Sequence, residues 1–182
     1  MLCYIGVGSN LGDRSENIRR AIVLLEKTEK LKVKKVSPLY ETEPWKGKGK
    51  QNDYFNLVLE IDCSLTPLEL LEELKEIQKK VGRKPRKRRW AAREIDLDIL
   101  IFDNLVVKGK RLCIPHPLIE ERFFVLKPLA DLAPDLKHPL WSFDVKTMLS
   151  FLKETGRWRK LDEEIIPNNS EKKDRRRLRR SR

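Results

Sequence analysis

The stretch REIDLDILIF, residues 93–102, has the pattern of a buried β-strand that carries two acids. The apolar residues between Ile95 and Phe102 favour a strand inside a sheet. Asp96 and Asp98 interrupt this apolar run. A buried carboxylate without a partner destabilises a fold strongly, because it loses its hydration. The stretch therefore predicts a strand in which another group compensates the two carboxylates.

The spacing of the two acids predicts that they share one face of the strand. Residues i and i+2 point to the same side, so Asp96 and Asp98 lie together while Leu97 and Ile99 point to the opposite side. Neighbouring carboxylates repel each other unless a cation lies between them. Mg²⁺ is one candidate, since it binds one or two carboxylates, water and substrate phosphates. Neutralisation by nearby arginines is the alternative, and the acids alone do not decide between the two.

A basic cluster, RKPRKRRWAAR at 83–93, directly precedes the acids and contains seven Lys or Arg and no acid. Arginine binds phosphate oxygens through two parallel hydrogen bonds. Arginines beside carboxylates that hold Mg²⁺ form the arrangement that phosphoryl transfer requires, because charge on the transferring oxygens must be neutralised. The alternative is a solvated loop or a nucleic-acid patch, in which Trp90 stacks on a base or anchors the loop.

The order of strand and helix patterns predicts the fold class. Strands are predicted at 2–8, 31–42, 54–63 and 96–102, with one helix after the turn at 8–12 and another at 66–82. The order strand, helix, strand, strand, helix, strand predicts an α+β fold, with a ferredoxin-like βαββαβ antiparallel sheet and helices packed on it. Helical pieces within 111–134 and a helix at 144–155 predict a C-terminal helical extension.

Local signals predict where the helices begin and end. Asp13 or Ser15 is the expected N-cap of the first helix. Thr66 and Glu69 form the pattern of a capping box around Pro67, and Gly82 ends the second helix. Within the strand at 31–42, Pro38 predicts an edge or a bulge, because proline cannot donate a hydrogen bond to a neighbouring strand.

The length of 182 residues suits one domain with a sizeable core. We predict a domain at 1–161 and a basic, mobile tail at 162–182, because the tail has few apolar residues to bury. Residues 171–182 carry eight basic and two acidic residues, which is half of the net charge of +12. Such a tail would attract nucleic acid at most nonspecifically, through its charge.

Three features predict a cytoplasmic protein. Cys3, Cys63 and Cys113 are odd in number, far apart and without CxxC spacing, which favours free thiols in a reducing compartment and argues against a metal cluster. No window approaches 18 consecutive apolar residues, so no membrane span is expected. The apolar N-terminal stretch has no basic segment ahead of it, and it predicts a strand rather than a signal peptide.

Two smaller motifs carry weaker signals. The sequence GSNLG at 8–12 lacks the spacing of a Walker or Rossmann loop, so it predicts a tight strand-to-helix turn rather than a phosphate site. His116 lies between Pro115 and Pro117, which hold it rigidly; a ligand contact and a structural role both remain open. His138 carries no motif, and we expect a structural role for it.

Four segments together resemble the 6-hydroxymethyl-7,8-dihydropterin pyrophosphokinase family of folate biosynthesis. They are YIGVGSNLGD (4–13), SPLYETEPW with QNDYFN (37–45 and 51–56), GRKPRKRRWAAREIDLDILIF (82–102) and IPHPLIEERFFVLKPLADLAP (114–134). The pattern W-x-x-R-x-x-D-L-D, from Trp90 to Asp98, is the most specific of these features. The resemblance extends in order and spacing from residue 2 to about residue 152.

The resemblance implies an enzyme that moves a pyrophosphoryl group from ATP to the hydroxymethyl oxygen of the dihydropterin and releases AMP. Asp96 and Asp98 would hold two Mg²⁺ ions, and Arg83 and Arg93 would contact the transferring phosphates. The nucleotide would be contacted by Arg89, Trp90, Ile99, Arg111, His116 and Arg122. The pterin pocket would be formed by Thr42, Glu43, Trp45, Tyr54, Asn56 and Phe124. Tyr54 and Phe124 would stack on the two faces of the pterin ring, and Asn56 would bond its edge.

The sequence departs from the family pattern at a few positions that bear on nucleotide binding. Gln78 replaces a common Glu, Pro85 a common Arg, and Cys113 a hydroxyl residue, while Ala91 and Ala92 replace a Gly-Pro pair. An RNA-binding ferredoxin-like module is the alternative function, since it would explain the charge and Trp90. Against it, the sequence lacks an aromatic RNP1-type string, and the acid pair would repel a phosphate backbone without a metal.

Overall fold

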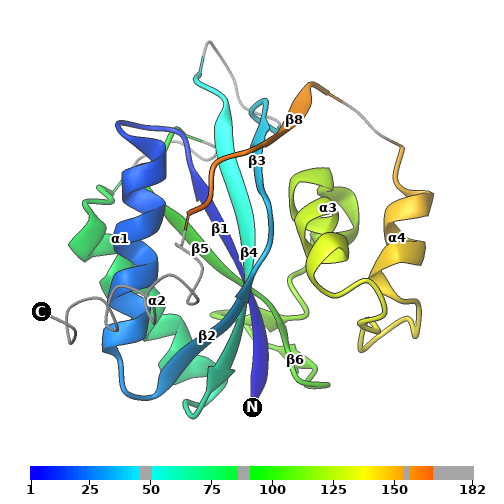
Figure 1. Cartoon of the computed structure of the whole chain (residues 1–182). Helices are drawn as coiled ribbons and strands as arrows, with labels where there is room; N and C mark the ends of the chain where they lie inside the picture. The colour runs from blue at the N-terminus through cyan, green and yellow to red at the C-terminus, as the bar shows by residue number, and fades with distance from the viewer. Residues whose placement is uncertain (46–50, 86–90, 154–155, 166–182) are drawn as a thin grey trace, which may run out of the picture.

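The computed structural model describes residues 1–45, 51–85, 91–153 and 156–165. Its centre is an antiparallel sheet in the order β5-β1-β4-β3-β8, with β2 also paired to β4 (Figure 1). The strands are β1 (Leu2–Ser9), β2 (Leu31–Val36), β3 (Leu39–Thr42), β4 (Tyr54–Cys63), β5 (Asp96–Phe102) and β8 (Trp158–Leu161). The short strands β6 (Val107–Lys108) and β7 (Cys113–Ile114) form a separate pair.

Helices cover both faces of the sheet. The first face carries α1 (Arg14–Lys27) and α2 (Pro67–Val81), and the opposite face carries α3 (Phe123–Leu132), with α4 (Val145–Phe151) packed outside α3 (Figure 1). A short 3₁₀ helix, η1 (Ile119–Glu121), precedes α3. Each face therefore has its own apolar core, and the central strands contribute side chains to both.

The alternation along β4 and β5 explains this double core. In β4, Leu57 and Leu59 belong to the core under α1 and α2, whereas Val58 belongs to the core under α3. In β5, Leu97 faces α1 and α2, and Leu100 faces α3. Residues two apart share a face, so the two acids of β5 lie on the α3 face of the sheet. They come before Leu100, at the end of the strand that the apolar core does not reach.

The structure confirms an α+β fold with an antiparallel sheet and confirms the local signals of the helix ends. Asp13 caps α1 by accepting a hydrogen bond of 3.0 Å from the amide of Glu16. Thr66 and Glu69 form the capping box of α2, which ends at Gly82 with φ 119°. The segment predicted as one strand at 31–42 is two strands, β2 and β3, separated by Ser37 and Pro38. The last predicted helix is shorter than 144–155, because α4 ends at Phe151.

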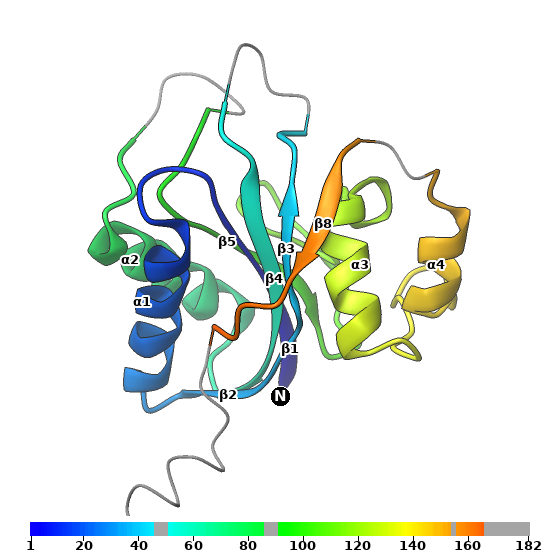
Figure 2. The same cartoon turned by 45° about the horizontal axis from the view of Figure 1, so that its top comes forward.

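The strand β8 was not predicted from the sequence; it pairs with β3 at the edge of the sheet (Figure 2). Beyond it, Ile165 is 6% exposed and packs in the core under α1 and α2, and Glu163 forms an ion pair with Arg19 of α1. The first residues of the predicted tail, 162–165, therefore contact the domain. Residues 166–182 lie outside the described part of the chain. None of the helices in the described ranges is long and apolar enough to cross a bilayer.

Candidate active site

A cavity of about 270 Å³ opens on the α3 face of the sheet, at the end where β5 and β4 begin. Its volume is near the lower end of the range for small-molecule sites. It brings together the predicted residues Thr42, Glu43, Trp45, Tyr54, Asn56, Arg93, Asp96, Asp98, His116, Arg122 and Phe124. Segments that are far apart in the chain meet here because the antiparallel pairing aligns the ends of β1, β3, β4 and β5.

Asp96 is held by two arginines. Its Oδ1 accepts a hydrogen bond of 2.7 Å from Arg83 Nη1, and its Oδ2 accepts one of 2.8 Å from Arg93 Nη1. All three side chains are about one-quarter exposed. Neutralisation by arginine, one of the two alternatives that the sequence left open, is therefore present at Asp96.

Within the described residues, Asp98 is compensated less well than Asp96. It forms an ion pair with Arg122, whose Nη1 lies 3.7 Å from Asp98 Oδ2. Burial at the cavity floor, together with the negative charge of Asp96, raises the pKa of Asp98 to about 6. Its side chain is nevertheless 42% exposed, so water and a ligand in the cavity can reach it. The strand thus presents one carboxylate that is neutralised by the protein and one that still favours an additional cation.

Gln78, a departure from the family pattern, holds one of the arginines in place. It is buried on α2, and its Oε1 accepts hydrogen bonds from the backbone amide of Leu97, at 3.2 Å, and from Arg83 Nη1. This single oxygen therefore connects α2 to β5 and orients Arg83 toward Asp96. Gln78 acts here through Arg83, a contact that sequence reasoning did not identify.

The GSNLG turn forms hydrogen bonds with two other segments beside the cavity, residues 51–52 and residues 93–94. Asn10 is fully buried, and its Oδ1 accepts a hydrogen bond of 2.7 Å from the amide of Arg93. Its Nδ2 donates to Gln51 Oε1 at 3.3 Å and to the carbonyl of Asn52 at 3.2 Å. Ser9 Oγ donates to the carbonyl of Glu94 at 2.7 Å. The prediction of a plain turn missed this role, although small polar residues that follow a buried strand were its visible signal.

Asn56 and Thr42 form the polar part of the cavity wall opposite the acids. Asn56 Nδ2 donates a hydrogen bond of 2.8 Å to Thr42 Oγ1, and both residues are nearly inaccessible to solvent. Gly8 pairs with Asn56 across β1 and β4. A Cβ atom at Gly8 would lie 3.0 Å from Asn56 Oδ1, so glycine allows this close approach.

Aromatic side chains line the same end of the cavity. The rings of Trp45 and Phe124 meet edge to face with centroids 6.1 Å apart. The guanidinium of Arg122 lies 5.1 Å from the centroid of Trp45 and 5.7 Å from that of Phe124. Tyr54 lines the cavity as well, and burial together with the charge of Asp96 raises its pKa. The two aromatic residues expected to stack on a pterin, Tyr54 and Phe124, therefore border one space.

His116 is a neutral ring at the cavity wall. Burial, together with the nearby charge of Arg122, lowers its pKa to about 4. Its Nδ1 accepts a hydrogen bond of 3.2 Å from the amide of Leu118. Arg122 Nη1 lies 3.4 Å from its Nε2. His116 is therefore an uncharged ring that borders the cavity beside the cation of Arg122.

Other predicted site residues lie elsewhere. Arg83 does not line the cavity, but it contacts Asp96. Ile99 is 4% exposed and packs in the core under α1 and α2. Arg111 is 68% exposed and pairs with Glu72 of α2 at 2.6 Å, away from the cavity. Arg89 and Trp90 lie outside the described residues. The nucleotide-contacting roles of all of these residues stay predictions.

No group of three or more His, Cys, Asp or Glu side chains in the described ranges is arranged to hold a metal. A cation bound by Asp96 and Asp98 would complete its shell with water and substrate oxygens. That donor set suits Mg²⁺, which keeps several waters and binds phosphates.

Solved structures share the fold of the chain. The chain superimposes with a TM-score of 0.62 and 18% identity on the crystal structure described as HPPK-DHPS in complex with substrates, and with 0.64 and 15% on wild-type Plasmodium falciparum HPPK-DHPS. Each match covers 82% of this chain, which spans less than half of those chains, 43% and 44%. At these identities the likeness supports the fold alone.

Sequence relatives are closer. A protein of Aquifex aeolicus named 2-amino-4-hydroxy-6-hydroxymethyldihydropteridine pyrophosphokinase is 43% identical over 143 residues, which cover 79% of this chain and 87% of the relative. A Bacillus subtilis protein of the same name is 42% identical over 136 residues, covering 75% and 80%. Residues 4–134 also match the family model of 7,8-dihydro-6-hydroxymethylpterin-pyrophosphokinase, or HPPK. The resemblance inferred from four segments is confirmed, and the chain belongs to the HPPK family.

Proposed function

We propose that the chain transfers a pyrophosphoryl group from ATP to the hydroxymethyl oxygen of 6-hydroxymethyl-7,8-dihydropterin, giving AMP and the pterin diphosphate in folate biosynthesis. One observation carries this proposal: a single cavity joins the acids and Arg93 at one end to the Asn56–Thr42 pair and the aromatic rings at the other. Phosphates and a pterin need these two chemistries side by side. The RNA-binding alternative has no support, because both sequence relatives are named as pyrophosphokinases.

The pterin is proposed to bind where Asn56 offers both an acceptor and a donor. Asn56 Nδ2 already donates to Thr42, so its remaining hydrogen and its Oδ1 are available to a heterocycle edge. Tyr54 and Phe124 supply ring faces, and Glu43 and Trp45 complete this part of the wall. A flat, polar-edged ring is the ligand that such a combination favours.

Asp96 and Asp98 are the proposed ligands of Mg²⁺, two ions in the family pattern. When bound, the ions neutralise charge on the triphosphate. Both oxygens of Asp96 accept hydrogen bonds from Arg83 and Arg93 in the present structure. Coordination by Asp96 therefore requires that at least one arginine loosens its contact. The released guanidinium would lie next to the phosphates and could bond them, so Asp96 would hold the arginines ready until the nucleotide arrives.

The nucleotide is proposed to extend from the acids toward His116 and Arg122. The neutral His116 would contact the nucleotide through its ring, and Arg122 would contact a phosphate or the pterin side of the cavity. Arg89, Trp90, Ile99 and Arg111 keep their proposed nucleotide contacts from the family pattern. A cytoplasmic location and two small-molecule substrates accord with this reaction.

Two structural assignments also remain proposals. The strand order β5-β1-β4-β3 supports the ferredoxin-like arrangement, with α3, α4 and β8 as additions to it. The division into a folded domain and a basic tail is the other proposal. Because Ile165 is buried, the boundary expected after residue 161 is proposed to lie after residue 165.

The test of the proposed function is AMP formation by the purified chain with ATP, Mg²⁺ and 6-hydroxymethyl-7,8-dihydropterin. We expect AMP and the pterin diphosphate in equal amounts. The matched control is 6-methyl-7,8-dihydropterin, which keeps the ring and lacks the accepting oxygen, and it should give no AMP. AMP release that does not depend on the hydroxymethyl group would contradict the proposal.

The variant Phe124→Ala should weaken pterin binding about tenfold, because an aromatic contact contributes roughly 0.5–1.5 kcal/mol beyond its buried area. Nucleotide affinity should stay unchanged, since Phe124 lies at the Trp45 end of the cavity. Calorimetry with each ligand separately provides the measurement. Phe143→Ala, at a half-exposed phenylalanine outside the cavity, is the control. Equal losses for both ligands would indicate damage to the fold instead.

A chain that ends at Pro167 should keep its melting temperature and its kcat/KM. It retains the buried Ile165 and the ion pair of Glu163 with Arg19. A chain that ends at Asp162 loses both and should melt at a lower temperature. Any retention of RNA by the full-length chain should fall on truncation and with added salt, because phosphate contacts release counterions. A large loss of turnover at the Pro167 boundary would contradict the assignment of the tail.

A further inference from the structure

We infer that β8 positions the pterin-binding wall of the cavity, by which we mean the wall formed by Thr42 and Tyr54. Arg157 and Arg159 are the positioning residues, and they act through Asp53 and Glu41. The inference rests on the proposed function, because it concerns the proposed pterin site. Neither arginine lines the cavity. Both lie outside residues 4–134, the part of the chain that matches the family model.

The backbone of β8 extends the sheet at the strand that carries Thr42. Thr42 pairs with Tyr54 of β4 on one side and with Trp158 of β8 on the other. The pairing continues past the end of β3, since the amide of Glu43 donates a hydrogen bond of 3.0 Å to the carbonyl of Arg157. Without β8, the strand β3, which ends at Thr42, would be a free edge of the sheet.

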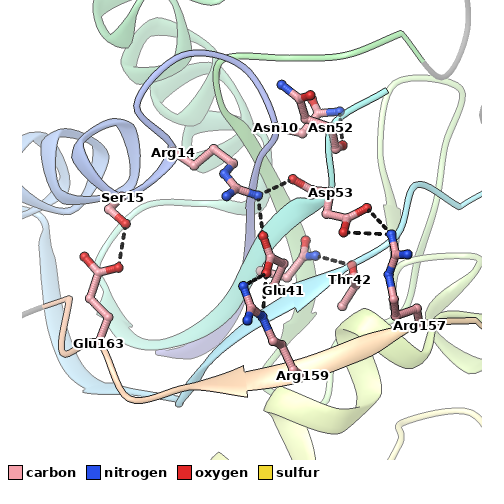
Figure 3. A network of polar contacts seen from close by, with 11 residues as sticks. Asn10, Arg14, Ser15, Glu41, Thr42, Asn52, Asp53, Arg157, Arg159 and Glu163 are labelled. Carbon is pink, nitrogen blue, oxygen red and sulfur yellow. Dashed lines mark hydrogen bonds and ion pairs between the residues drawn. The ribbon is translucent and has the colours of Figure 1, made fainter. Parts of the chain in front are cut away.

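Two arginines of this C-terminal segment contact the stretches of chain on either side of the β3–β4 connection (Figure 3). We call these stretches arms: one, at 41–45, contains Thr42, and the other, at 51–56, contains Tyr54. Arg159 Nε donates a hydrogen bond of 2.7 Å to Glu41 Oε2, on the arm that continues into Thr42. Arg157 Nη2 lies 3.1 Å from Asp53 Oδ2 and 3.3 Å from Oδ1, on the arm that continues into Tyr54. One short segment thus contacts both sides of the β3–β4 connection.

Arg14 joins the two arms from the other side of the network (Figure 3). Its Nη1 donates to Glu41 Oε1 at 2.8 Å and to the carbonyl of Asp53 at 2.7 Å, while its guanidinium lies 3.6 Å from the centroid of Phe55. The Glu41 side chain is only 13% exposed. Burial alone would raise its pKa, but hydrogen bonds from Arg159 and Arg14 outweigh burial and lower it. Glu41 therefore remains a carboxylate shared by α1 and β8.

The opposite face of β8 reaches the other wall of the cavity. Trp158 packs against Tyr40 of β3, with ring centroids 5.8 Å apart, and against Phe123 of α3, at 5.0 Å. Phe123 directly precedes Phe124, which lines the cavity. The strand is thus linked through its arginines to the Thr42–Tyr54 wall and through Trp158 to the Phe124 wall, the two sides between which the pterin is proposed to stack.

Because both arginines are exposed, their effect on the order of the pocket can be measured apart from any effect on the stability of the whole fold. Arg157 and Arg159 are 75% and 71% exposed, and ion pairs of exposed side chains contribute little to folding. Their removal should leave the melting temperature close to that of the parent chain. It should release the two arms of the β3–β4 connection, and a pocket that is less well ordered before binding loses affinity.

The experiment compares the parent chain with the double variant Arg157→Gln/Arg159→Gln. We expect the dissociation constant for 6-hydroxymethyl-7,8-dihydropterin, measured with a nonhydrolysable ATP analogue, to rise about fivefold to tenfold, because the pocket is less well ordered before binding. The KM for the pterin should rise in parallel, while kcat and the affinity for the ATP analogue stay unchanged. Lys160→Gln removes a positive charge from the same strand without touching Glu41 or Asp53, and it should behave like the parent. Arg159→Lys with Arg157→Lys should recover part of the affinity.

Hydrogen exchange gives a readout that needs no substrate. The backbone amides of 41–45 and 51–56 should exchange faster in the double variant, and those of α2 should not. Unchanged exchange there, or an unchanged pterin affinity in the double variant of a parent that binds pterin, would overturn the inference. Equal losses for both ligands with a lower melting temperature would reduce β8 to a structural strand and overturn it too. A parent that binds no pterin would contradict the proposed function, and the exchange measurement would still decide on β8.

Discussion

Asp96→Asn and Asp98→Asn are each expected to lower turnover by about 10³-fold or more while the chain stays folded. Each replacement keeps the size of the side chain and removes one carboxylate from the α3 face of β5. The phosphates of ATP then lose the cation that the two acids would hold in position. Since the reaction depends on neutralising charge on the transferring group, turnover should suffer far more than pterin binding.

The two variants should differ in stability, and this difference separates a site residue from a structural one. Asp96 accepts hydrogen bonds from Arg83 and Arg93, so Asp96→Asn should lower the melting temperature by a few degrees. Asp98 has a folded pKa raised to about 6, which is above its unfolded value. At pH values below the unfolded pKa, Asp98 is protonated and therefore stabilises the fold. This contribution is lost as the pH rises through about 6. At neutral pH without ligand, Asp98→Asn should melt at the parental temperature or above it.

The measurements are kcat against Mg²⁺ concentration, and melting temperature between acidic and neutral pH without metal or ATP. Asp62→Asn, at an exposed aspartate of β4 that pairs with Lys34, is the matched control and should be indistinguishable from the parent. Turnover near the parental value in either site variant at low Mg²⁺ would rule out the metal assignment. A melting curve of Asp98→Asn that keeps the parental pH dependence would contradict the account of Asp98.

Arg93→Ala is expected to lower kcat about 10³-fold, by analogy with arginines that stabilise the transition state of phosphoryl transfer. Arg93 lines the cavity and contacts Asp96, so its guanidinium lies next to the carboxylates that would hold the triphosphate. Interactions that strengthen only in the transition state lower kcat when removed, with smaller effects on substrate affinity. The backbone of Arg93 is held by Asn10, so the loop end should keep its place in the variant.

Steady-state kinetics with both substrates varied tests this expectation. Arg93→Lys keeps the charge and loses the planar pair of donors, so its kcat should fall between those of the parent and of Arg93→Ala. Arg83→Ala provides a second comparison, because Arg83 contacts the other oxygen of Asp96 and is held by Gln78. An effect on KM alone would assign Arg93 to binding of the substrate in the ground state.

The sequence by itself determined the features that depend on neighbours in the chain. The spacing of Asp96 and Asp98 sets their common face, because side chains alternate along any strand. The caps at Asp13 and Thr66 and the end of α2 at Gly82 follow from local hydrogen bonds and backbone freedom. The family resemblance added most of the residues that line the cavity. It implies which residues far apart in the chain meet in one site, and local sequence patterns do not carry this information.

Only the tertiary structure decided how these residues share charge and hydrogen bonds. It showed that the two acids have different partners among the described residues: Asp96 accepts hydrogen bonds from two arginines, whereas Asp98 has a longer ion pair with Arg122. It also showed that Asn10 forms hydrogen bonds with both residues 51–52 and residue 93. It also placed Arg111 on Glu72 rather than in the cavity, and it added β8 to the edge of the sheet. The physical reason is common to all of these. Each contact joins segments distant in the chain, so its partner is set by the packing of the sheet and helices and not by the residues beside it.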